Sequence, residues 1–217
     1  MTSNCSLSLL VLNKYKSLSS RELVSMDKNV RIRMLNMLSG LRTAYLIGTC
    51  DIDKTSNLGL FNSVVHIGAS PALLGFIMRP VHVRRDTYCN ILETESFTLN
   101  AIHPDFLERA HKASSKYDAT VSEFDMVGLT EEWRQDTPSP FVLESRLKIG
   151  LGLQEILDIK SNDTKLIIGR IEHIFIEGEN IIDADGHIRH EELDLMVVSG
   201  LEQYYSILPL ERFRYKN

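Results

Sequence analysis

Short apolar runs separated by polar turns dominate the first half of the chain, and this pattern is typical of β-strands. Compact apolar runs over residues 43–48, 61–67 and 73–78 predict three strands. Residues 68–71, with the sequence Gly-Ala-Ser-Pro, separate the last two runs and predict a hairpin-like connection. Residues 96–100 predict another strand. The first hundred residues therefore favour a sheet.

Helix signals stand on both sides of these runs. Ser19 is a predicted N-cap, and Glu22, three residues later, is its capping-box partner. A short helical piece is expected over residues 30–38, with Gly40 ending it. Asp86 is expected to cap a short helix that runs through Leu92.

The middle of the chain has a different pattern. Residues 104–116 show helical spacing of their apolar positions, with Pro104 near the first turn, where proline is tolerated. Residues 122–129 predict a second short helix. Residues 130–140 are polar and contain two prolines, so a loop is expected there.

Strand signals resume in the last third. Residues 142–159 and 165–176 predict long strands, and residues 183–186, with the sequence Asp-Ala-Asp-Gly, predict a turn. Residues 191–205 are expected to be partly helical. Many strands with a helical insertion in the middle predict a mainly β fold, a β-barrel with helical decorations.

Nothing in the sequence divides this pattern into two folded halves. The chain has 217 residues, no internal repeat and no low-complexity linker. We therefore expect an N-terminal extension with a short helix over residues 1–30 and one domain over residues 31–217. The apolar run at residues 7–12 is too short to cross a bilayer and lacks the flanks of a secretion signal, so a cytoplasmic protein without membrane contact is expected.

Composition narrows the class of function. With 43% apolar and 24% charged residues the chain reads as a soluble globular protein, and its net charge of −5 argues against a nucleic-acid partner. Cys5, Cys50 and Cys89 are far apart in the sequence and form no CxxC spacing. Neither disulfides nor a thiolate metal site is therefore expected, and a reducing compartment fits.

A basic loop is the first candidate for chemistry. Arg79, Arg84 and Arg85, with His82 and the hydroxyl of Thr87, are close together just before the predicted helix at residue 86. Arginine offers a planar fork of donors that matches phosphate oxygens, and backbone amides at a helix start add further donors. The alternative is a solvated surface loop, because charge clusters are common in loops.

Two polar segments are further candidates. Asn57, Asn62 and Ser63 lie at a strand entrance, where Gly59 permits close backbone approach and the amides suit the edge of a flavin or a nucleobase. The alternative is ordinary turn chemistry. Residues 111–116 contain hydroxyls that could contact a ligand from a helix C-terminus, although such residues more often simply end a helix.

Three other patterns do not support a site. Residues 150–152, Gly-Leu-Gly, lack the remainder of a dinucleotide fingerprint and predict a strand with a bulge. His187 and His190 follow two aspartates in a turn without metal-site spacing, so no metal is expected. No GxSxG elbow supports hydrolase chemistry.

Four patches, taken together in order and spacing, resemble the flavin reductase-like family, the FMN-binding split-barrel proteins that include flavoredoxin-type members. They are residues 42–49 (the family's first strand), 57–63 with Ser70 and Pro71 (its flavin-edge turn), 79–100 (its phosphate loop, short helix and next strand), and 110–130 (its helical insertion). The resemblance covers roughly residues 35–205. It implies a mainly β fold, an FMN-binding split β-barrel with helical insertions, and a homodimer with FMN near the subunit interface.

The resemblance also implies a set of FMN contacts, with no catalytic residue and no metal. The residues that would border the isoalloxazine are Asn57, Phe61, Asn62 and Ser63; those that would hold the phosphate are Arg79, Arg85 and Thr87, with Arg84 as a substitute; Ser114 and Ser115 would approach from the helical insertion. The chain departs from the family pattern at Lys54, Ala72 and Asn62. These departures touch the flavin edge, where redox tuning and substrate access are decided.

Three hypotheses for the function follow from the resemblance. The first is an FMN-dependent oxidoreductase of the flavin reductase type, in which hydride passes from NAD(P)H to the flavin and then to a small-molecule or protein acceptor. The second is a flavoredoxin-like electron carrier that a protein partner reduces. The third is a split-barrel binding protein that has lost flavin.

Overall fold

The computed structural model describes residues 15–115, 117, 121–200 and 202–213, and it divides into two compact units between Gly40 and Leu41. The predicted division after residue 30 would lie inside a helix of the first unit. Cys5, Lys116 and the apolar run at residues 7–12 lie outside the described residues. Among the described residues, no helix combines the length and the apolar character needed to cross a bilayer.

The first unit contains two helices, α2 (Ser20–Ser25) and α3 (Lys28–Leu38). Ser19 caps α2, and the reciprocal bonds between Ser19 and Glu22 confirm the predicted capping box. Asp27 caps α3 by accepting hydrogen bonds from two backbone N–H groups of its first turn. None of the side chains in either helix is buried.

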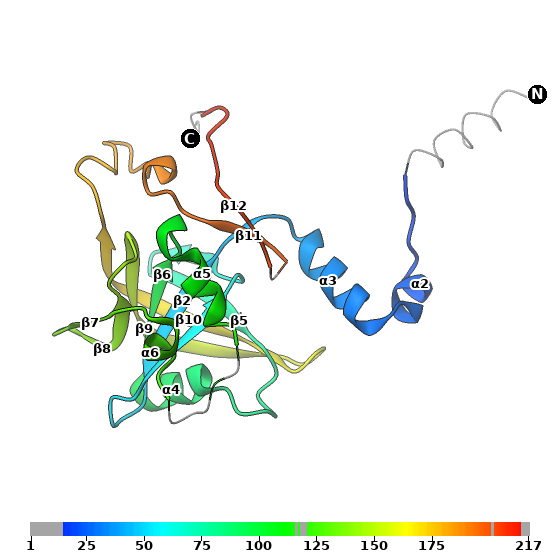
Figure 1. The fold of residues 1–217 in the computed structure, drawn as a ribbon, viewed down its shortest axis with the longest axis horizontal. Coiled ribbons are helices and arrows are strands. Elements are labelled where there is room, and N and C mark those ends of the chain that lie inside the picture. The colour runs from blue at the N-terminus through cyan, green and yellow to red at the C-terminus, as the bar shows by residue number, and fades with distance from the viewer. Residues whose placement is uncertain (1–14, 116, 118–120, 201, 214–217) are drawn as a thin grey trace, which may run out of the picture. The chain divides into compact units, whose positions relative to one another are not determined.

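A seven-stranded antiparallel sheet forms the body of the second unit (Figure 1), in the order β3-β2-β6-β9-β10-β5-β4. These strands are β2 (Tyr45–Cys50), β3 (Ser56–Phe61), β4 (Val65–Ala69), β5 (Ala72–Met78), β6 (Ser96–Ala101), β9 (Leu147–Ile159) and β10 (Thr164–Ile176). Two smaller sheets accompany it: β1 (Arg42–Thr43) with β11 (Val197–Ser199) and β12 (Gln203–Tyr205), and β7 (Glu131–Arg134) with β8 (Thr137–Val142). The predicted mainly β fold is confirmed.

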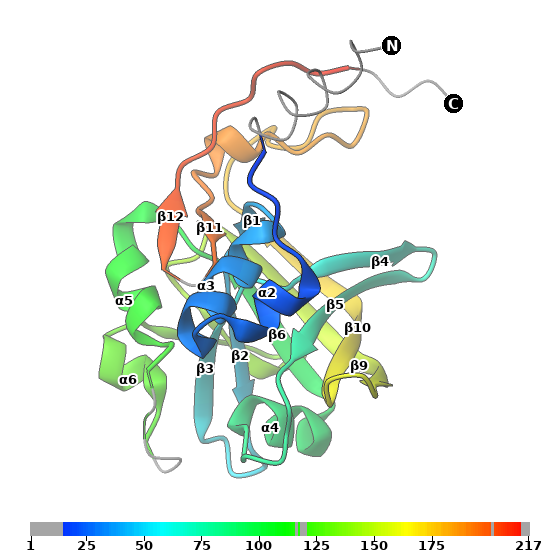
Figure 2. The same ribbon diagram turned by 90° about the vertical axis from the view of Figure 1, so that its right-hand side faces the viewer.

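Helices lie at one end and along one side of this sheet. α4 (Asp86–Thr94) contacts β2 and β3 near the end of their hairpin, and α6 (Glu123–Val127) contacts β3. α5 (Leu107–Lys112) follows the short helix η1 (Pro104–Phe106), and η2 (His190–Glu192) precedes β11. Figure 2 shows α5 and α6 beside β3, and the β4–β5 hairpin extending away from the other strands.

Several local predictions are confirmed. Residues 68–71 connect β4 and β5 as a hairpin, and η1 with α5 forms the helix expected after Pro104. β9 contains the two glycines of residues 150–152, and its pairing with β10 shifts register there, which is a bulge. The side chain of Asp183 accepts backbone hydrogen bonds from Asp185 and His187, which closes the predicted turn.

Other local predictions are wrong. The run at residues 61–67 is not one strand, because β3 ends at Phe61 and β4 begins at Val65. Residues 56–61, expected to be turn and strand entrance, form β3 by pairing with β2 across a tight turn. Polar Ser56 and Asn57 hid this strand, since its polar side chains are buried in hydrogen bonds rather than exposed.

The segment at residues 130–140 is also not a loop, since it contains β7 and most of β8. Among the described strands β8 pairs with β7 alone, so its two prolines need not donate to a second strand. Their carbonyls instead accept side-chain hydrogen bonds: Pro138 O from Lys54, and Pro140 O from Thr98. Of the described residues in the range 191–205, the end of η2 is the helical part, and Val197 and Val198 pair with β1 as a strand.

The core lies on both faces of the sheet. Alternation along β2 sends Ile47 to one cluster, with Phe76 and Phe97, and Leu46 to the other, under the helices α5 and α6. In the first cluster Phe61, Phe76 and Phe97 make successive edge-to-face contacts, at centroid distances of 5.0 and 5.4 Å. This core fixes the end of β3 and the position of α4, on which the candidate site depends.

Candidate functional site

The N-terminus of α4 follows the basic loop directly. Arg85 is the N-cap residue, not Asp86 as predicted, and its side chain makes no capping hydrogen bond. The first hydrogen bond of the helix runs from Cys89 N to Arg85 O, so the backbone N–H groups of residues 86–88 have no partner within the helix. Three free N–H groups at the positive end of a nine-residue helix provide an anion-accepting site.

The arginines of the loop differ in what they can do. Arg84 Nε donates to Asp86 Oδ1 at 2.7 Å, and the Arg84 side chain is 71% exposed. This pairing takes up the carboxylate that was expected to cap the helix. Arg79 is exposed. Arg85 is half-buried, and its Nε is a buried donor without a hydrogen-bond partner.

A buried charged donor without a partner is costly, since it loses its hydration and gains nothing in exchange. Arg85 therefore lacks the acceptor that its Nε needs in the ligand-free chain. A phosphate oxygen would supply such an acceptor at the end of α4. The orphan Nε and the free amides of the first turn together fit a phosphate group.

Four buried polar side chains meet between this helix end and the β2–β3 hairpin. Thr49, Asn57, Thr87 and Asn90 are 0%, 8%, 7% and 6% exposed. Asn57 Nδ2 donates to Thr49 Oγ1 and to Thr87 Oγ1, both at 3.0 Å, and Asn90 Nδ2 donates to Thr49 Oγ1 at 3.2 Å. The structure thus brings the predicted residues Asn57 and Thr87 together, although they are 30 positions apart in the sequence.

Gly59 leaves room beside the Thr87 hydroxyl. A Cβ atom added at Gly59 would lie 3.3 Å from Thr87 Oγ1 and 2.9 Å from a ring carbon of Phe61. Contacts this short require a neighbour to shift. A side chain at this position would have to displace the Phe61 ring or the Thr87 hydroxyl, which favours glycine here.

A small polar hollow of about 30 Å³ lies along the free edge of β3, next to the helix end. Its lining residues are Asp51, Thr55, Ser56, Asn57, Arg84, Asp86, Asn90, Val121 and Glu123. The Glu123 carboxylate accepts a hydrogen bond from Leu58 N at 3.0 Å, and burial raises the pKa of Glu123 above its usual value. This hollow has room for about one water molecule, so a flavin ring would need space beyond it.

The other residues of the predicted flavin edge have partners in the structure. Phe61 packs against Phe76, and the Ser63 hydroxyl accepts a hydrogen bond from Ile77 N at 3.1 Å, which joins the start of the β4 connection to the end of β5. Asn62 Nδ2 donates to the backbone carbonyl of Gly200, at the turn after β11. These contacts hold Phe61 and Ser63 near the start of the basic loop, because β5 ends one residue before Arg79.

The structure does not connect Ser114 and Ser115 to this group. Both are exposed; Ser114 Oγ donates to His111 O at 2.7 Å and Ser115 N donates to Lys112 O at 3.0 Å, which are bonds that end α5. Within the described residues, no hydrogen bond or ion pair links either serine to α4 or β3.

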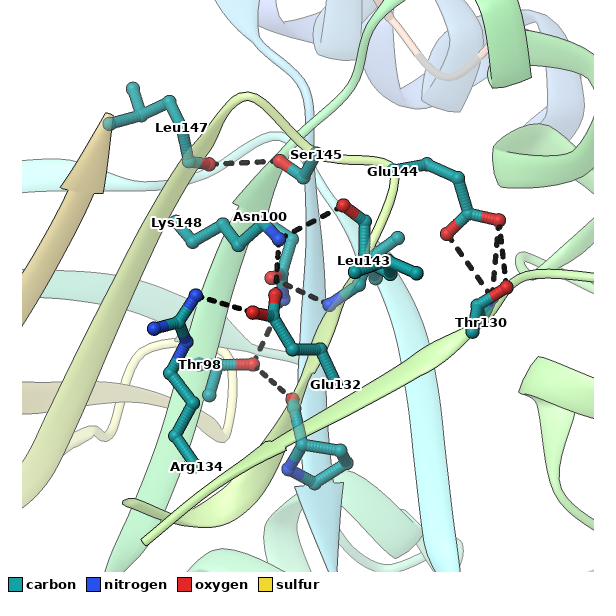
Figure 3. Close-up of polar contacts among 12 residues, drawn as sticks. Thr98, Asn100, Thr130, Glu132, Arg134, Leu143, Glu144, Ser145, Leu147 and Lys148 are labelled. Carbon is teal, nitrogen blue, oxygen red and sulfur yellow. Dashed lines mark hydrogen bonds and ion pairs between the residues drawn. The ribbon is translucent and has the colours of Figure 1, made fainter. Parts of the chain in front are cut away.

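A second polar cluster, which the sequence did not reveal, ties the β7–β8 hairpin to the sheet (Figure 3). Lys148, whose side chain is 9% exposed, donates to Glu132 and to Leu143 O, and Glu132 also pairs with Arg134. Asn100 accepts a hydrogen bond from Val142 N at 2.9 Å. The sequence signal for this cluster was Lys148, a charged residue between apolar residues of β9. Its partners come from other segments and are visible only in the folded chain. This cluster holds the hairpin and shares no residue with the helix end.

Comparison with known proteins gives a consistent family assignment. The model of the flavin reductase like domain matches residues 38–192. The chain is 36% identical to a Shewanella frigidimarina NCIMB 400 protein assigned as a flavin reductase with split barrel domain; the match covers 93% of this chain and 100% of that one, with a TM-score of 0.88.

Two more distant relatives extend this picture. Flavoredoxin of Desulfovibrio vulgaris (Miyazaki F) has a TM-score of 0.72 at 20% identity, over 93% of this chain and 97% of that one, which shows the fold alone. A protein of Aquifex aeolicus (strain VF5) is 22% identical over 148 residues, or 67% of this chain and 74% of that one. The match to the Shewanella frigidimarina structure confirms the predicted split-barrel fold.

Proposed function

This chain belongs to the flavin reductase-like family, and on that premise we propose that it is an FMN-dependent oxidoreductase that takes hydride from NAD(P)H. Family membership implies flavin binding and oxidoreductase chemistry. The helix end at Arg85–Thr87 is the observation that supports FMN as the flavin. There the buried Arg85 Nε without a partner and the free backbone amides of the first turn fit a terminal phosphate.

The chain's own groups have binding and orienting roles in this proposal. Arg85 and Thr87 hold the phosphate, with Arg79 adding positive charge from the same loop. Phe61, Asn62 and Ser63 border the ring system at the end of β3. When bound, FMN supplies the two-electron chemistry of accepting a hydride from NAD(P)H, so no side chain of this chain need act as acid or base.

We include a homodimer in the proposal. Strand β4 forms one edge of the main sheet, and its side chains Val65 and Ile67 are 44% and 39% exposed. An apolar edge strand is a surface that proteins usually cover. Light scattering of the purified protein tests this part: a monomer mass at micromolar concentration would exclude a stable dimer.

The redox part is tested by mixing FMN-loaded protein anaerobically with NADH or with NADPH and following the flavin absorbance. Rapid and complete bleaching of the bound FMN by one equivalent of at least one nicotinamide supports the reductase. No bleaching with either, while a chemical reductant bleaches the same sample, would leave a flavin-binding carrier reduced by a partner protein. Failure of the protein to bind FMN at all would refute the flavoprotein reading.

A further inference from the structure

We infer that Thr49, Asn57 and Asn90 form a buried positioning network that orients the Thr87 hydroxyl toward the ligand phosphate, so that this site selects a phosphorylated flavin over riboflavin. The inference rests on the proposed FMN function and assigns roles that the family resemblance does not imply. In particular, it places the Asn57 side chain behind the phosphate site rather than at the edge of the flavin ring.

The assignment follows from counting donors and acceptors. A side-chain amide nitrogen carries two hydrogens, and Asn57 Nδ2 uses one on Thr49 and one on Thr87. Thr49 Oγ1 has two lone pairs and accepts from both Asn57 and Asn90. The amide donors of Asn57 are therefore fully used inside the protein, and its nitrogen has no hydrogen left for a ligand.

Among the described residues the same count leaves one hydrogen unused on each of Thr49 Oγ1, Thr87 Oγ1 and Asn90 Nδ2, and of these three only the Thr87 hydroxyl belongs to the first turn of α4. Thr87 Oγ1 acts as the acceptor toward Asn57, so its own O–H hydrogen is not used in that bond. Among the described residues no acceptor for this hydrogen is recorded. Thr87 is the second residue of α4, at the end where the free amides lie, so its hydroxyl is placed to donate to an anion bound there.

The fold holds these four side chains firmly. Thr49 and Asn57 are directly opposed in the β2–β3 pair, and Thr87 and Asn90 are three residues apart on one face of α4. All four are more than nine-tenths buried, so their bonds are not exchanged with solvent. The network thus joins the hairpin to the helix at the point where the phosphate is proposed to bind.

A purely structural network would predict a different result on mutation. If it served only to hold α4 on the sheet, its loss would also displace the free amides of α4, and FMN binding would weaken even in a chain that lacks the Thr87 hydroxyl. If it orients Thr87 toward the phosphate, its loss weakens FMN binding only while that hydroxyl is present. The ratio of the two dissociation constants isolates the contribution of the phosphate, because riboflavin has the same ring and lacks the phosphate, and comparing this ratio with and without the Thr87 hydroxyl separates the alternatives.

The experiment titrates ligand-free protein with FMN and with riboflavin, following flavin fluorescence, in the wild type and in T49V, T49S and T98V. Thr49→Val keeps the shape and removes the acceptor, whereas Thr49→Ser keeps a hydroxyl. Thr98→Val is the matched control, since Thr98 is also 0% exposed and its hydroxyl donates to Pro140 O at 2.7 Å, away from α4. Melting temperatures confirm that each variant is folded.

We expect the wild type to bind FMN more tightly than riboflavin. In T49V the ratio of the riboflavin to the FMN dissociation constant should fall roughly tenfold, and in T49S and T98V it should stay at the wild-type value. Thr87→Val should lower the preference by itself, and T49V should add little to it in the double variant, because both act through one hydroxyl. A folded T49V with the wild-type preference, or full additivity with T87V, overturns the inference.

Two further outcomes are also decisive. If T49V does not fold, Asn90→Ala tests the same network from the helix, and an unchanged FMN preference in N90A overturns the inference. If the wild type prefers FMN and the variants keep the same preference, the proposed function stands and this inference is refuted. If wild type binds neither flavin, the proposed function itself is refuted.

Discussion

Replacing Arg85 with alanine should weaken FMN binding without weakening the ligand-free fold. Most buried arginines stabilise a protein through their hydrogen bonds, so their loss lowers both stability and binding. Arg85 differs, because its Nε is buried without a partner in the ligand-free chain. Its removal takes away an unpaired donor rather than a bond.

The expected sizes follow from this difference. A hydrogen bond between a charged donor and a phosphate is worth about 1.5–3 kcal/mol, which corresponds to about a 10- to 150-fold weaker dissociation constant. The unpaired donor costs the ligand-free protein about 1–3 kcal/mol, and R85A removes this cost. The variant also loses the packing of the arginine side chain, which offsets part of the gain. We therefore expect the melting temperature of ligand-free R85A to equal or exceed that of the wild type.

The assay combines FMN fluorescence titration with thermal melting of ligand-free protein. Arg84→Ala is the comparator, because it removes the same charge from the same loop, yet Arg84 Nε is already paired with Asp86 and its side chain is 71% exposed. R84A should weaken FMN binding less than R85A does. Equal losses in the two variants would point to general electrostatic attraction. A clear fall in the melting temperature of ligand-free R85A, with unchanged FMN affinity, would refute the reasoning.

Three other outcomes test the fold, at the site and at the β7–β8 hairpin. Burial raises the pKa of Glu123, so the stabilisation from its protonated form is complete below the unfolded pKa near 4.5 and is lost as pH rises through the folded pKa. The melting temperature of Glu123→Gln should therefore gain on that of the wild type as pH rises from acidic to neutral. A difference in melting temperature that does not change with pH would contradict this. Gly48→Ala places a Cβ 2.3 Å from Pro140 O, a backbone atom, and should lower the free energy of unfolding in urea by about 1–3 kcal/mol. Lys148→Met removes one of the cations bonded to Glu132 and should cost about 1–3 kcal/mol by the same measurement, whereas a neutral result would show that the ion pair is replaceable.

Local signals in the sequence were sufficient for much of the fold. The capping box at Ser19 and Glu22, the β4–β5 hairpin and the turn at Asp183 depend on neighbours within a few residues, and all are confirmed. The apolar runs of β2 and β5 are strong enough to identify strands by themselves. The mainly β class and the order of the patches that resemble the family followed from these signals.

The misassigned segments have a common physical cause. In β3 the polar side chains form hydrogen bonds with residues far along the chain, such as Thr87 and Glu131. In β8 the Pro140 carbonyl accepts a hydrogen bond from Thr98, and the strand pairs with a single neighbour among the described strands. Neither arrangement is visible in a local pattern. Asp86 was expected to cap α4, but its carboxylate is bound by Arg84. Short-range propensity was outweighed in each case by a contact that exists only in the folded chain.

The sequence by itself determined that a cationic loop precedes a short helix and that a polar, glycine-containing segment lies some thirty residues before it. It could not show which of these cations lacks a partner, nor that Asn57 and Thr87 share a hydrogen bond. Those facts depend on the pairing of β2 with β3 and on the packing of α4 against that hairpin, which remove the side chains from water and leave each polar atom dependent on its neighbours. Only the tertiary structure therefore separated Arg85 from Arg84, and turned two distant segments into one proposed phosphate site.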